Sequence, residues 1–293
     1  MKKKKKWWAI LLFVLFGIAV MLYIVFPAGM GVIASTRQTL EPATPPDGFE
    51  AISLTASDDV HLSAWYKAPD NGAVIVLVHG SAGSLESIRE YANMLSSHDY
   101  GILALGLRGH GSSGGSGNTL GWECDKDIKA AVDYLNEQSD VKNIGALGLS
   151  LGGEVLLSTC SDFPEIAAIV SDGGTHHTIA DYLSMGANQS LWRSFTTRVM
   201  YASAELFTGQ KPPETTILAS IKFAADTKLL FIAAGNVADE VDYNTMFSTV
   251  TAGRSELWIV PDAGHTQGFF VYPDAYETRV TDFFDAALLG GEG

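Results

Sequence analysis

Six short, almost uninterrupted apolar runs limit what this chain can fold into more than any other feature. They cover residues 73–80, 100–109, 143–150, 166–174, 228–235 and 255–264. Strands that are covered on both faces are apolar along their whole length, because neither face meets water. Segments with apolar residues three and four positions apart separate most of the runs, as amphipathic helices would. The pattern predicts an α/β fold with a mostly parallel sheet and helices on both faces.

Two segments depart from this alternation. Residues 51–57 and 61–69 alternate apolar and polar side chains around an acidic turn, which predicts an antiparallel hairpin at the sheet edge. Residues 175–227 separate two core strands by more than one crossover helix needs, and they are rich in large apolar side chains. We expect them to form a helical cap insertion over the carboxyl ends of the strands. The alternative is a long crossover whose aromatic side chains face the core.

The amino terminus carries a run of 20 uncharged residues, from Trp7 to Phe26. As a helix it would span the bilayer core of about 30 Å. The basic residues at 1–6 place the amino terminus in the cytoplasm, so this run predicts a single-pass signal anchor in the cell membrane with an extracytoplasmic body. The alternative is a cleaved signal peptide ending at Val32-Ile33-Ala34, which would make the protein secreted.

Residues 27–48 are predicted to form a Pro-rich linker, and residues 49–293 a catalytic domain. The whole chain has 19 basic and 33 acidic residues and a net charge of −14. Five of the basic residues lie in the first six positions, so the body is even more acidic than the whole chain. Such a body repels nucleic acid, and we expect no nucleic-acid partner.

Two cysteines, Cys124 and Cys160, are too few for a disulfide framework and lack the paired spacing of a zinc site. They could pair in an oxidising compartment, but we expect two buried free thiols. The glycine-rich segment at 111–117 lacks the Lys-Ser/Thr ending of a phosphate-binding loop. The sequence therefore predicts no metal and no cofactor.

The strongest chemical motif is Gly-Leu-Ser-Leu-Gly at positions 148–152, which follows an apolar run and precedes a helical segment. A sharp turn from strand to helix crowds the positions two before and two after the serine, so Gly148 and Gly152 suit it. The strained turn would expose the hydroxyl of Ser150 as a nucleophile.

Two partners for this serine follow in the order Ser, Asp, His. His265 comes directly after the last apolar run, and Asp239 comes four residues after the run before it. His265 would act as the base, and Asp239 would orient its ring. We prefer Asp239 because it follows a turn of small residues, with Glu240, Asp242 and Asp172 as further candidates.

The Gly-rich bend at His79-Gly80-Ser81-Ala82-Gly83 ends the first buried strand. The backbone N–H groups of Ser81 and Leu151 are predicted to form an oxyanion hole. We expect the side chain of His79 to play a structural part, by bonding to local backbone.

These motifs together resemble the α/β-hydrolase family, in particular its serine esterases, lipases and related peptidases. The likeness rests on VIVLVHGSAG, LRGHGSSGG, GLSLGG and DAGH, and it extends from Phe49 to Leu289. The sequence departs from the family in two places. Gly106 stands where relatives often carry aspartate, and the acid turn is stretched between Gly235 and Asp239.

The resemblance implies a serine hydrolase that cleaves a small acyl ester or thioester through an acyl-enzyme, with membrane lipid around its anchor. A peptidase of the same fold uses the same catalytic groups and is the first alternative. The second is a catalytically silent binding module, because a fold does not ensure a function.

Overall fold

The computed structural model describes residues 2–185, 190–224 and 226–290. These residues form an eight-stranded sheet with the strand order β1-β2-β4-β3-β5-β6-β7-β8. The strands are β1 (Glu50–Thr55), β2 (His61–Lys67), β3 (Ala73–Val78), β4 (Gly101–Leu105), β5 (Asn143–Leu149), β6 (Ile166–Asp172), β7 (Lys228–Ala234) and β8 (Ser255–Val260).

The sheet is mostly parallel, as predicted. Strands β4, β3, β5, β6, β7 and β8 are parallel to their neighbours, whereas β1 and β2 form an antiparallel pair and β2 is antiparallel to β4. The predicted hairpin is therefore present, and β1 is the edge strand. The carboxyl ends of the parallel strands all lie at one edge of the sheet, which is where open α/β sheets bind their ligands.

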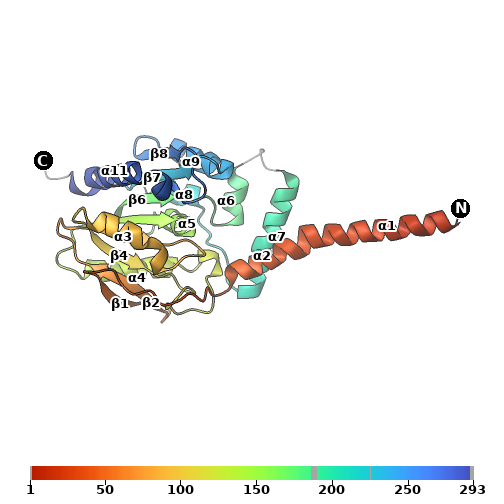
Figure 1. The fold of residues 1–293 in the computed structure, drawn as a ribbon, viewed down its shortest axis with the longest axis horizontal. Helices are drawn as coiled ribbons and strands as arrows, with labels where there is room; N and C mark the ends of the chain where they lie inside the picture. Colours follow the sequence, from red (N-terminus) through yellow and green to blue (C-terminus); the bar gives the residue numbers. More distant parts are fainter. Residues whose placement is uncertain (1, 186–189, 225, 291–293) are drawn as a thin grey trace.

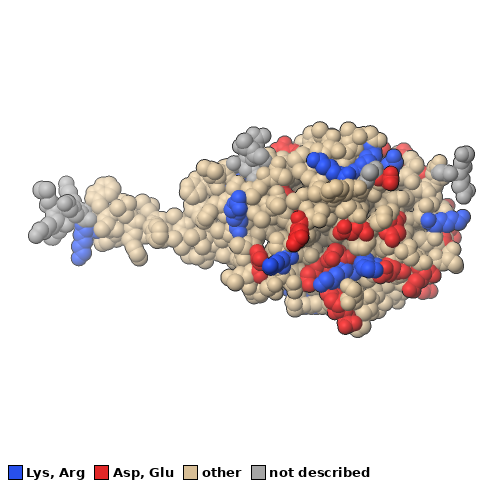
Figure 2. Space-filling model, turned by 180° about the vertical axis from the view of Figure 1, so that it is seen from behind, with Lys and Arg blue, Asp and Glu red and all other residues tan. Residues whose placement is uncertain are grey.

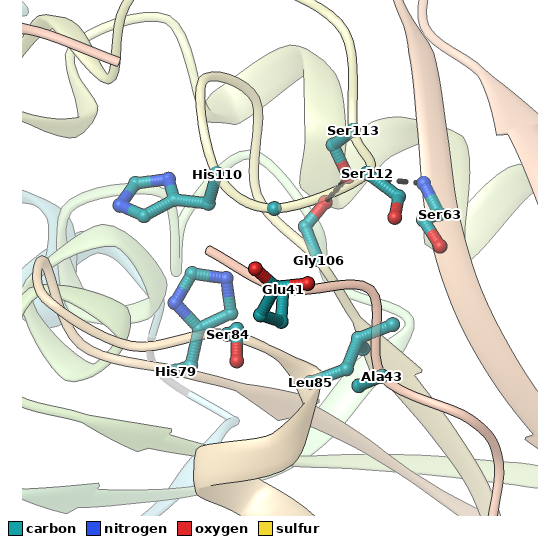
Figure 3. Close-up of a pocket in the computed structure, with 11 residues that line it drawn as sticks. Glu41, Ala43, Ser63, His79, Ser84, Leu85, Gly106, His110, Ser112 and Ser113 are labelled. Carbon is teal, nitrogen blue, oxygen red and sulfur yellow. Dashed lines mark hydrogen bonds between the residues drawn. The ribbon is translucent and has the colours of Figure 1, made fainter. Parts of the chain in front are cut away.

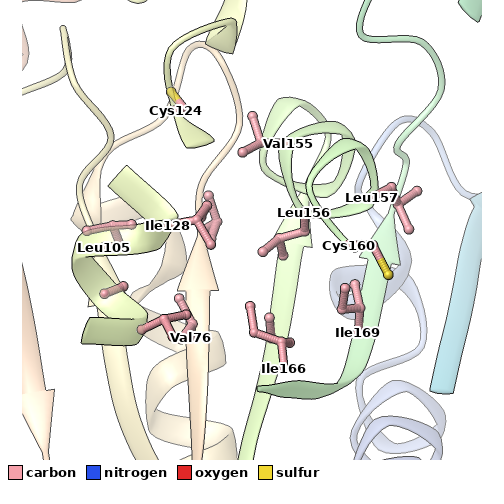
Figure 4. Packing of buried hydrophobic residues seen from close by; sticks show 14 of the residues in the cluster. Val76, Leu105, Cys124, Ile128, Val155, Leu156, Leu157, Cys160, Ile166 and Ile169 are labelled. Atoms are coloured by element: carbon pink, nitrogen blue, oxygen red, sulfur yellow. The ribbon is translucent and has the colours of Figure 1, made fainter. Parts of the chain in front are cut away.

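Two hydrophobic clusters cover the two faces of the sheet. Side chains alternate along β3, so that Val76 joins one cluster and Ile75 joins the other. The first cluster contains residues of α4 (Asp125–Asn136), α5 (Leu151–Ser158), α8 (Ile217–Phe223) and α9 (Ala238–Val250). Figure 4 shows Ile128 and Leu156 in this layer, together with the buried free thiols of Cys124 and Cys160.

The second cluster lies on the opposite face of the sheet. It contains residues of α3 (Arg89–Ser96) and α11 (Pro273–Phe284), together with the short helices η2 (Leu85–Ile88) and η5 (Asp285–Leu289). Two further short helices, η3 (Thr119–Gly121) and α10 (Gly268–Val271), lie in the loops. Helices thus cover both faces, which is the reason that the strands are apolar along their whole length.

The long interval between β6 and β7 forms α6 (Ile179–Ser184), α7 (Leu191–Thr208) and α8. The insertion is helical, as predicted, but its helices differ in environment. Ile217 and Ile221 of α8 are fully buried in the sheet layer, so α8 is the crossover helix. On α7, Tyr201 is buried whereas Leu191 and Trp192 are exposed. The large side chains of this interval are therefore partly buried and partly exposed, and a cap over the carboxyl ends of the strands stays a prediction.

The amino terminus is one continuous helical rod composed of α1 (Lys2–Val20), η1 (Met21–Val25) and α2 (Phe26–Ser35). It projects from one end of the body (Figure 1). By its length and composition, the segment Lys6–Ser35 is sufficient to cross a membrane. The helix continues nine residues beyond Phe26, so the predicted linker starts too early. The reason is tertiary packing, because α2 lies against α7 and the hydroxyl of Ser203 donates to the carbonyl oxygen of Ala28 at 2.9 Å.

Residues 36–48, which we call the strap, run along the body. The Arg37 guanidinium donates to the carbonyl oxygens of Gly111, Ser113 and Gly115. Gln38 forms an isolated parallel bridge with His110. The expected tether is therefore extended but bound to the body, and it joins the amino-terminal rod to the same loops that surround the candidate site.

Candidate active site

Ser150 stands at a sharp turn between β5 and α5. Its φ of 50° and ψ of −115° lie outside the regions that side-chain-bearing residues usually adopt. A Cβ atom at Gly148 would lie 2.4 Å from the carbonyl carbon of Gly152, and one at Gly152 would lie 2.3 Å from the carbonyl oxygen of Val78. Only glycine fits at these two positions, so the sequence motif and the strained turn have the same steric cause.

The side chains of Ser150 and His265 meet at the carboxyl edge of the sheet. The Nε2 atom of His265 lies 2.8 Å from the Oγ atom of Ser150, although the residues are 115 positions apart. Each residue follows a parallel strand, β5 or β8, and this shared geometry brings them together. The other ring nitrogen faces a carboxylate, which only accepts hydrogen bonds. The proton of the neutral ring therefore belongs on Nδ1, and Nε2 accepts from the hydroxyl.

The carboxylate at His265 belongs to Glu240 and not to Asp239. The Oε1 atom of Glu240 lies 2.5 Å from His265 Nδ1, and its Oε2 atom accepts from the backbone N–H of Ala234 at 2.8 Å. Asp239 instead forms an ion pair with Arg193 of α7, with about half of each side chain exposed. The prediction of Asp239 as the partner of His265 is therefore wrong, and Glu240, one of the predicted alternatives, occupies that position.

The direction of each side chain on α9 explains this correction. Neighbouring residues of a helix point about 100° apart, so Asp239 and Glu240 cannot face the same way. Glu240, Tyr243, Asn244 and Phe247 are buried at helical spacing, whereas Asp239 lies on the exposed side. The apolar side chains at 243 and 247 already indicate the buried face in the sequence. That signal identifies position 240, whereas the turn of small residues before Asp239 does not.

The two other candidate acids lie elsewhere. Asp172 is buried at the end of β6 and accepts a hydrogen bond of 3.0 Å from the Tyr276 hydroxyl. Burial raises the pKa of Asp172 to about 7. Asp242 is exposed on α9. Glu240 is the carboxylate that bonds to the ring of His265, and this hydrogen bond raises the pKa of His265 above its ordinary value.

A cavity of about 420 Å³ opens in front of this pair. Its lining includes Ser81, Ser150, His265 and the aromatic side chains of Tyr91 and Phe270. Ser81 thus shares a cavity with Ser150. Leu151 is the first residue of α5, and the first N–H groups of a helix have no acceptor within it. These two backbone N–H groups are the candidate donors to an oxyanion.

Two histidines, His79 and His110, form hydrogen bonds that hold the loop carrying Ser81. His79 Nε2 accepts from the backbone N–H of Leu107 at 3.1 Å, and its Nδ1 lies 2.8 Å from the carbonyl oxygen of Gly80. The expectation that His79 bonds to local backbone is confirmed. His110 Nε2 lies 2.9 Å from the carbonyl oxygen of Ser81. The two histidines therefore hold the loop at the position from which Ser81 faces the cavity.

A smaller pocket lies behind this loop (Figure 3). The strap residues Glu41 and Ala43 line it together with both histidines. Gly106 lies at its base, where the hydroxyl of Ser113 donates to the Gly106 carbonyl oxygen at 2.7 Å. A Cβ atom at Gly106 would lie 2.9 Å from the carbonyl oxygen of Ser63. The space that an aspartate would need at this position is therefore taken by backbone.

The strand order, the two helical layers and the nucleophile turn define an α/β-hydrolase fold. The family model described as the α/β hydrolase fold matches residues 73–205, which extend from β3 into α7. This match covers the candidate oxyanion loop and Ser150, and it ends before Glu240 and His265.

The comparisons with individual proteins cover more of the chain. The YfhR protein of Salmonella typhi is 23% identical over 94% of this chain and 95% of its own length. The protein Rv2307c of Mycobacterium tuberculosis is 27% identical over 80% of this chain and 76% of its own length. Among solved structures, the Pyrococcus furiosus esterase Pf2001 superposes with a TM-score of 0.68 at 23% identity, covering 86% of this chain and 98% of the esterase.

Proposed function

We propose that this protein is a membrane-anchored serine hydrolase that cleaves carboxylic esters or thioesters with a triad of Ser150, His265 and Glu240. One observation carries the proposal: contacts of 2.8 Å and 2.5 Å join the Ser150 hydroxyl, the His265 ring and the buried Glu240 carboxylate. The similarity in fold to a Pyrococcus furiosus protein that is named an esterase supports the same class of reaction.

The first half of the reaction forms an acyl-enzyme. His265 Nε2 takes the proton of Ser150 as its Oγ atom attacks the carbonyl carbon of the substrate. The negative charge that develops on the carbonyl oxygen is bound by the N–H groups of Ser81 and Leu151. The imidazolium then donates its proton to the departing alcohol or thiol. Glu240 holds the ring in the required tautomer and stabilises its positive charge throughout.

The second half of the reaction releases the acid. Water attacks the acyl carbon while His265 Nε2 takes one of its protons, and the proton returns to Ser150 Oγ as the acyl bond breaks. Tyr91 and Phe270 line the cavity beside the serine, and Phe270 is 65% exposed. The exposed ring of Phe270 offers an apolar surface to the acyl part of the substrate, which favours acyl or aromatic esters.

Covalent labelling tests the proposed function directly. A fluorophosphonate should label the full-length chain at Ser150, because the probe needs a serine that is activated by a neighbouring base. Ser150→Ala should abolish the labelling, whereas Ser87→Ala, which changes another serine of the same cavity, should retain it. Absence of labelling on folded chain would exclude the serine hydrolase and favour a binding module.

Activity should decline as the pH falls through the pKa of His265. The base works only as neutral imidazole, and the hydrogen bond that His265 Nδ1 donates to Glu240 raises the pKa of His265 above 6.5. The acidic limb of kcat/KM for a p-nitrophenyl ester, recorded from about pH 5 to about pH 9, should therefore have its midpoint above the ordinary histidine value. Asp239→Asn should leave this midpoint unchanged. A midpoint below 6.5 in the unaltered enzyme would contradict the assignment.

A further inference from the structure

Helix α7 presents an apolar stripe away from the body. Leu191, Phe195, Ala202 and Leu206 share one helical face, since they follow one another by four, seven and four positions. Leu191 and Leu206 are 86% and 87% exposed, which is unusual for leucine in contact with water. The opposite face of α7 is buried, and its Tyr201 ring stacks on Trp122. The exposed stripe therefore belongs to a well-packed helix. An apolar surface of this kind marks a site of contact with another protein or with a membrane.

Helix α7, which carries this stripe, contacts the amino-terminal rod near its carboxyl-terminal end. The ring of Trp192 lies 5.0 Å from that of Tyr23, and Ser203 bonds to the carbonyl oxygen of Ala28. The uncharged part of the rod runs from Trp7 to Thr36, and its first 20 residues end at Phe26, between these two contacts. With these 20 residues spanning a hydrocarbon core of about 30 Å, α7 crosses the rod where it leaves the core.

Two sets of contacts fix the orientation of the rod: one joins α2 to α7, and the other joins the strap to the body. A Cβ atom at Gly31 would lie 2.1 Å from the Met200 carbonyl oxygen, so the backbones of α2 and α7 are in close contact. The strap binds the chain after α2 to the body through Arg37. In Figure 1, α7 lies across the end of the body from which α1 projects. A membrane that surrounds the rod would thus meet α7 before any other part of the body.

Two charged side chains flank the stripe. Arg198 is exposed where its guanidinium can reach lipid phosphates, and the exposed Glu205 lies seven positions further along the same edge of the helix. Figure 2 shows mostly uncharged surface where the rod joins the body, while the acidic side chains on this view gather further away. Tryptophan, which α7 contributes at position 192, is typical of the headgroup level of a bilayer.

We propose that α7 lies in the headgroup region of the membrane that the rod spans, with Leu191, Phe195 and Leu206 inserted among the lipids. The proposal rests on the anchoring function proposed for the rod. The ion pair of Arg193 with Asp239 joins α7 to α9, the helix that carries Glu240.

The test measures lipid contact at single positions in the full-length chain. The variants Leu206→Cys, Leu15→Cys and Thr245→Cys are each labelled with an environment-sensitive fluorophore and reconstituted in phosphatidylcholine and phosphatidylglycerol vesicles containing spin-labelled lipid. Position 15 reports the rod, and position 245 is an exposed site on α9. Cys124 and Cys160 are buried, and the unaltered chain gives the labelling background.

We expect quenching at position 206 to be at least about five-fold stronger than at position 245 and close to that at position 15. Quenching at 15 together with none at 206 would overturn the docking of α7 and leave the anchor intact. Energy transfer between labels on two chains at position 206, without lipid quenching, would also overturn it and assign the stripe to a second copy. Absence of quenching at all three positions would overturn the anchor as well. Fluorophosphonate labelling of the same vesicles reports the hydrolase function separately.

Discussion

Ser150→Ala is expected to lower kcat/KM for ester hydrolysis by a factor on the order of 10⁶, because the substitution removes the only atom that forms the acyl bond. Turnover of p-nitrophenyl esters by the purified full-length chain measures the loss. His265→Ala should reach a similar loss, since Ser150 without its base is a poor nucleophile.

Two features separate a loss of chemistry from a loss of folding. The triad acts as a unit, so the double variant Ser150→Ala with His265→Ala should be little worse than either single one. The circular dichroism spectrum and the midpoint of thermal unfolding should stay close to those of the unaltered chain. Activity that survives in Ser150→Ala within about ten-fold would show that another group carries the reaction.

Glu240→Gln is expected to lower kcat by about three to four orders of magnitude, whereas Asp239→Asn should stay within about three-fold of the unaltered enzyme. Glutamine retains the size of the side chain but loses the negative charge that stabilises imidazolium, and its amide can impose the wrong tautomer on His265. Asp239 is half exposed and pairs with Arg193 at the surface, where ion pairs contribute little.

Glu240→Gln and Asp239→Asn are matched substitutions, because each removes one negative charge and the two positions are adjacent. Comparing them therefore tests which carboxylate assists His265. A large loss in Asp239→Asn with normal activity in Glu240→Gln would contradict the geometry of α9. Asp172→Asn is a third comparison. Asp172 accepts a hydrogen bond from Tyr276, so its substitution should lower the midpoint of thermal unfolding. The main effect should be on stability and not on kcat.

The sheet and the pair of Ser150 with His265 could be predicted because their signals are local. Each buried strand is a continuous apolar run, and the nucleophile turn needs glycine at two fixed positions for steric reasons that involve only nearby backbone. His265 is the next residue after the last apolar run, residues 255–264. Parallel strands then bring these positions to one edge without further information.

The position of the amino-terminal segment depends on tertiary contacts, and the choice of acid depends on the buried face of α9. Which of two adjacent acidic residues faces His265 depends on the rotation of α9, which Tyr243 and Phe247 set by packing on the sheet layer. The helix beyond Phe26 is held by α7, where Ser203 lies 175 positions from its partner Ala28, and the uncharged residues up to Thr36 do not show where the helix ends. The same holds for Arg37, whose three carbonyl partners all lie in one distant loop.

The close backbone contact between α2 and α7 has a consequence for shedding of the body. A protease that cut after Ala34 would remove the helix that covers Met200 and Ser203, and the freed enzyme would expose a second side of α7. Such a fragment would have two adjacent apolar sides and a tendency to self-associate. The amino-terminal helix is therefore a part of the packed protein, and a form without it would need another surface to cover α7.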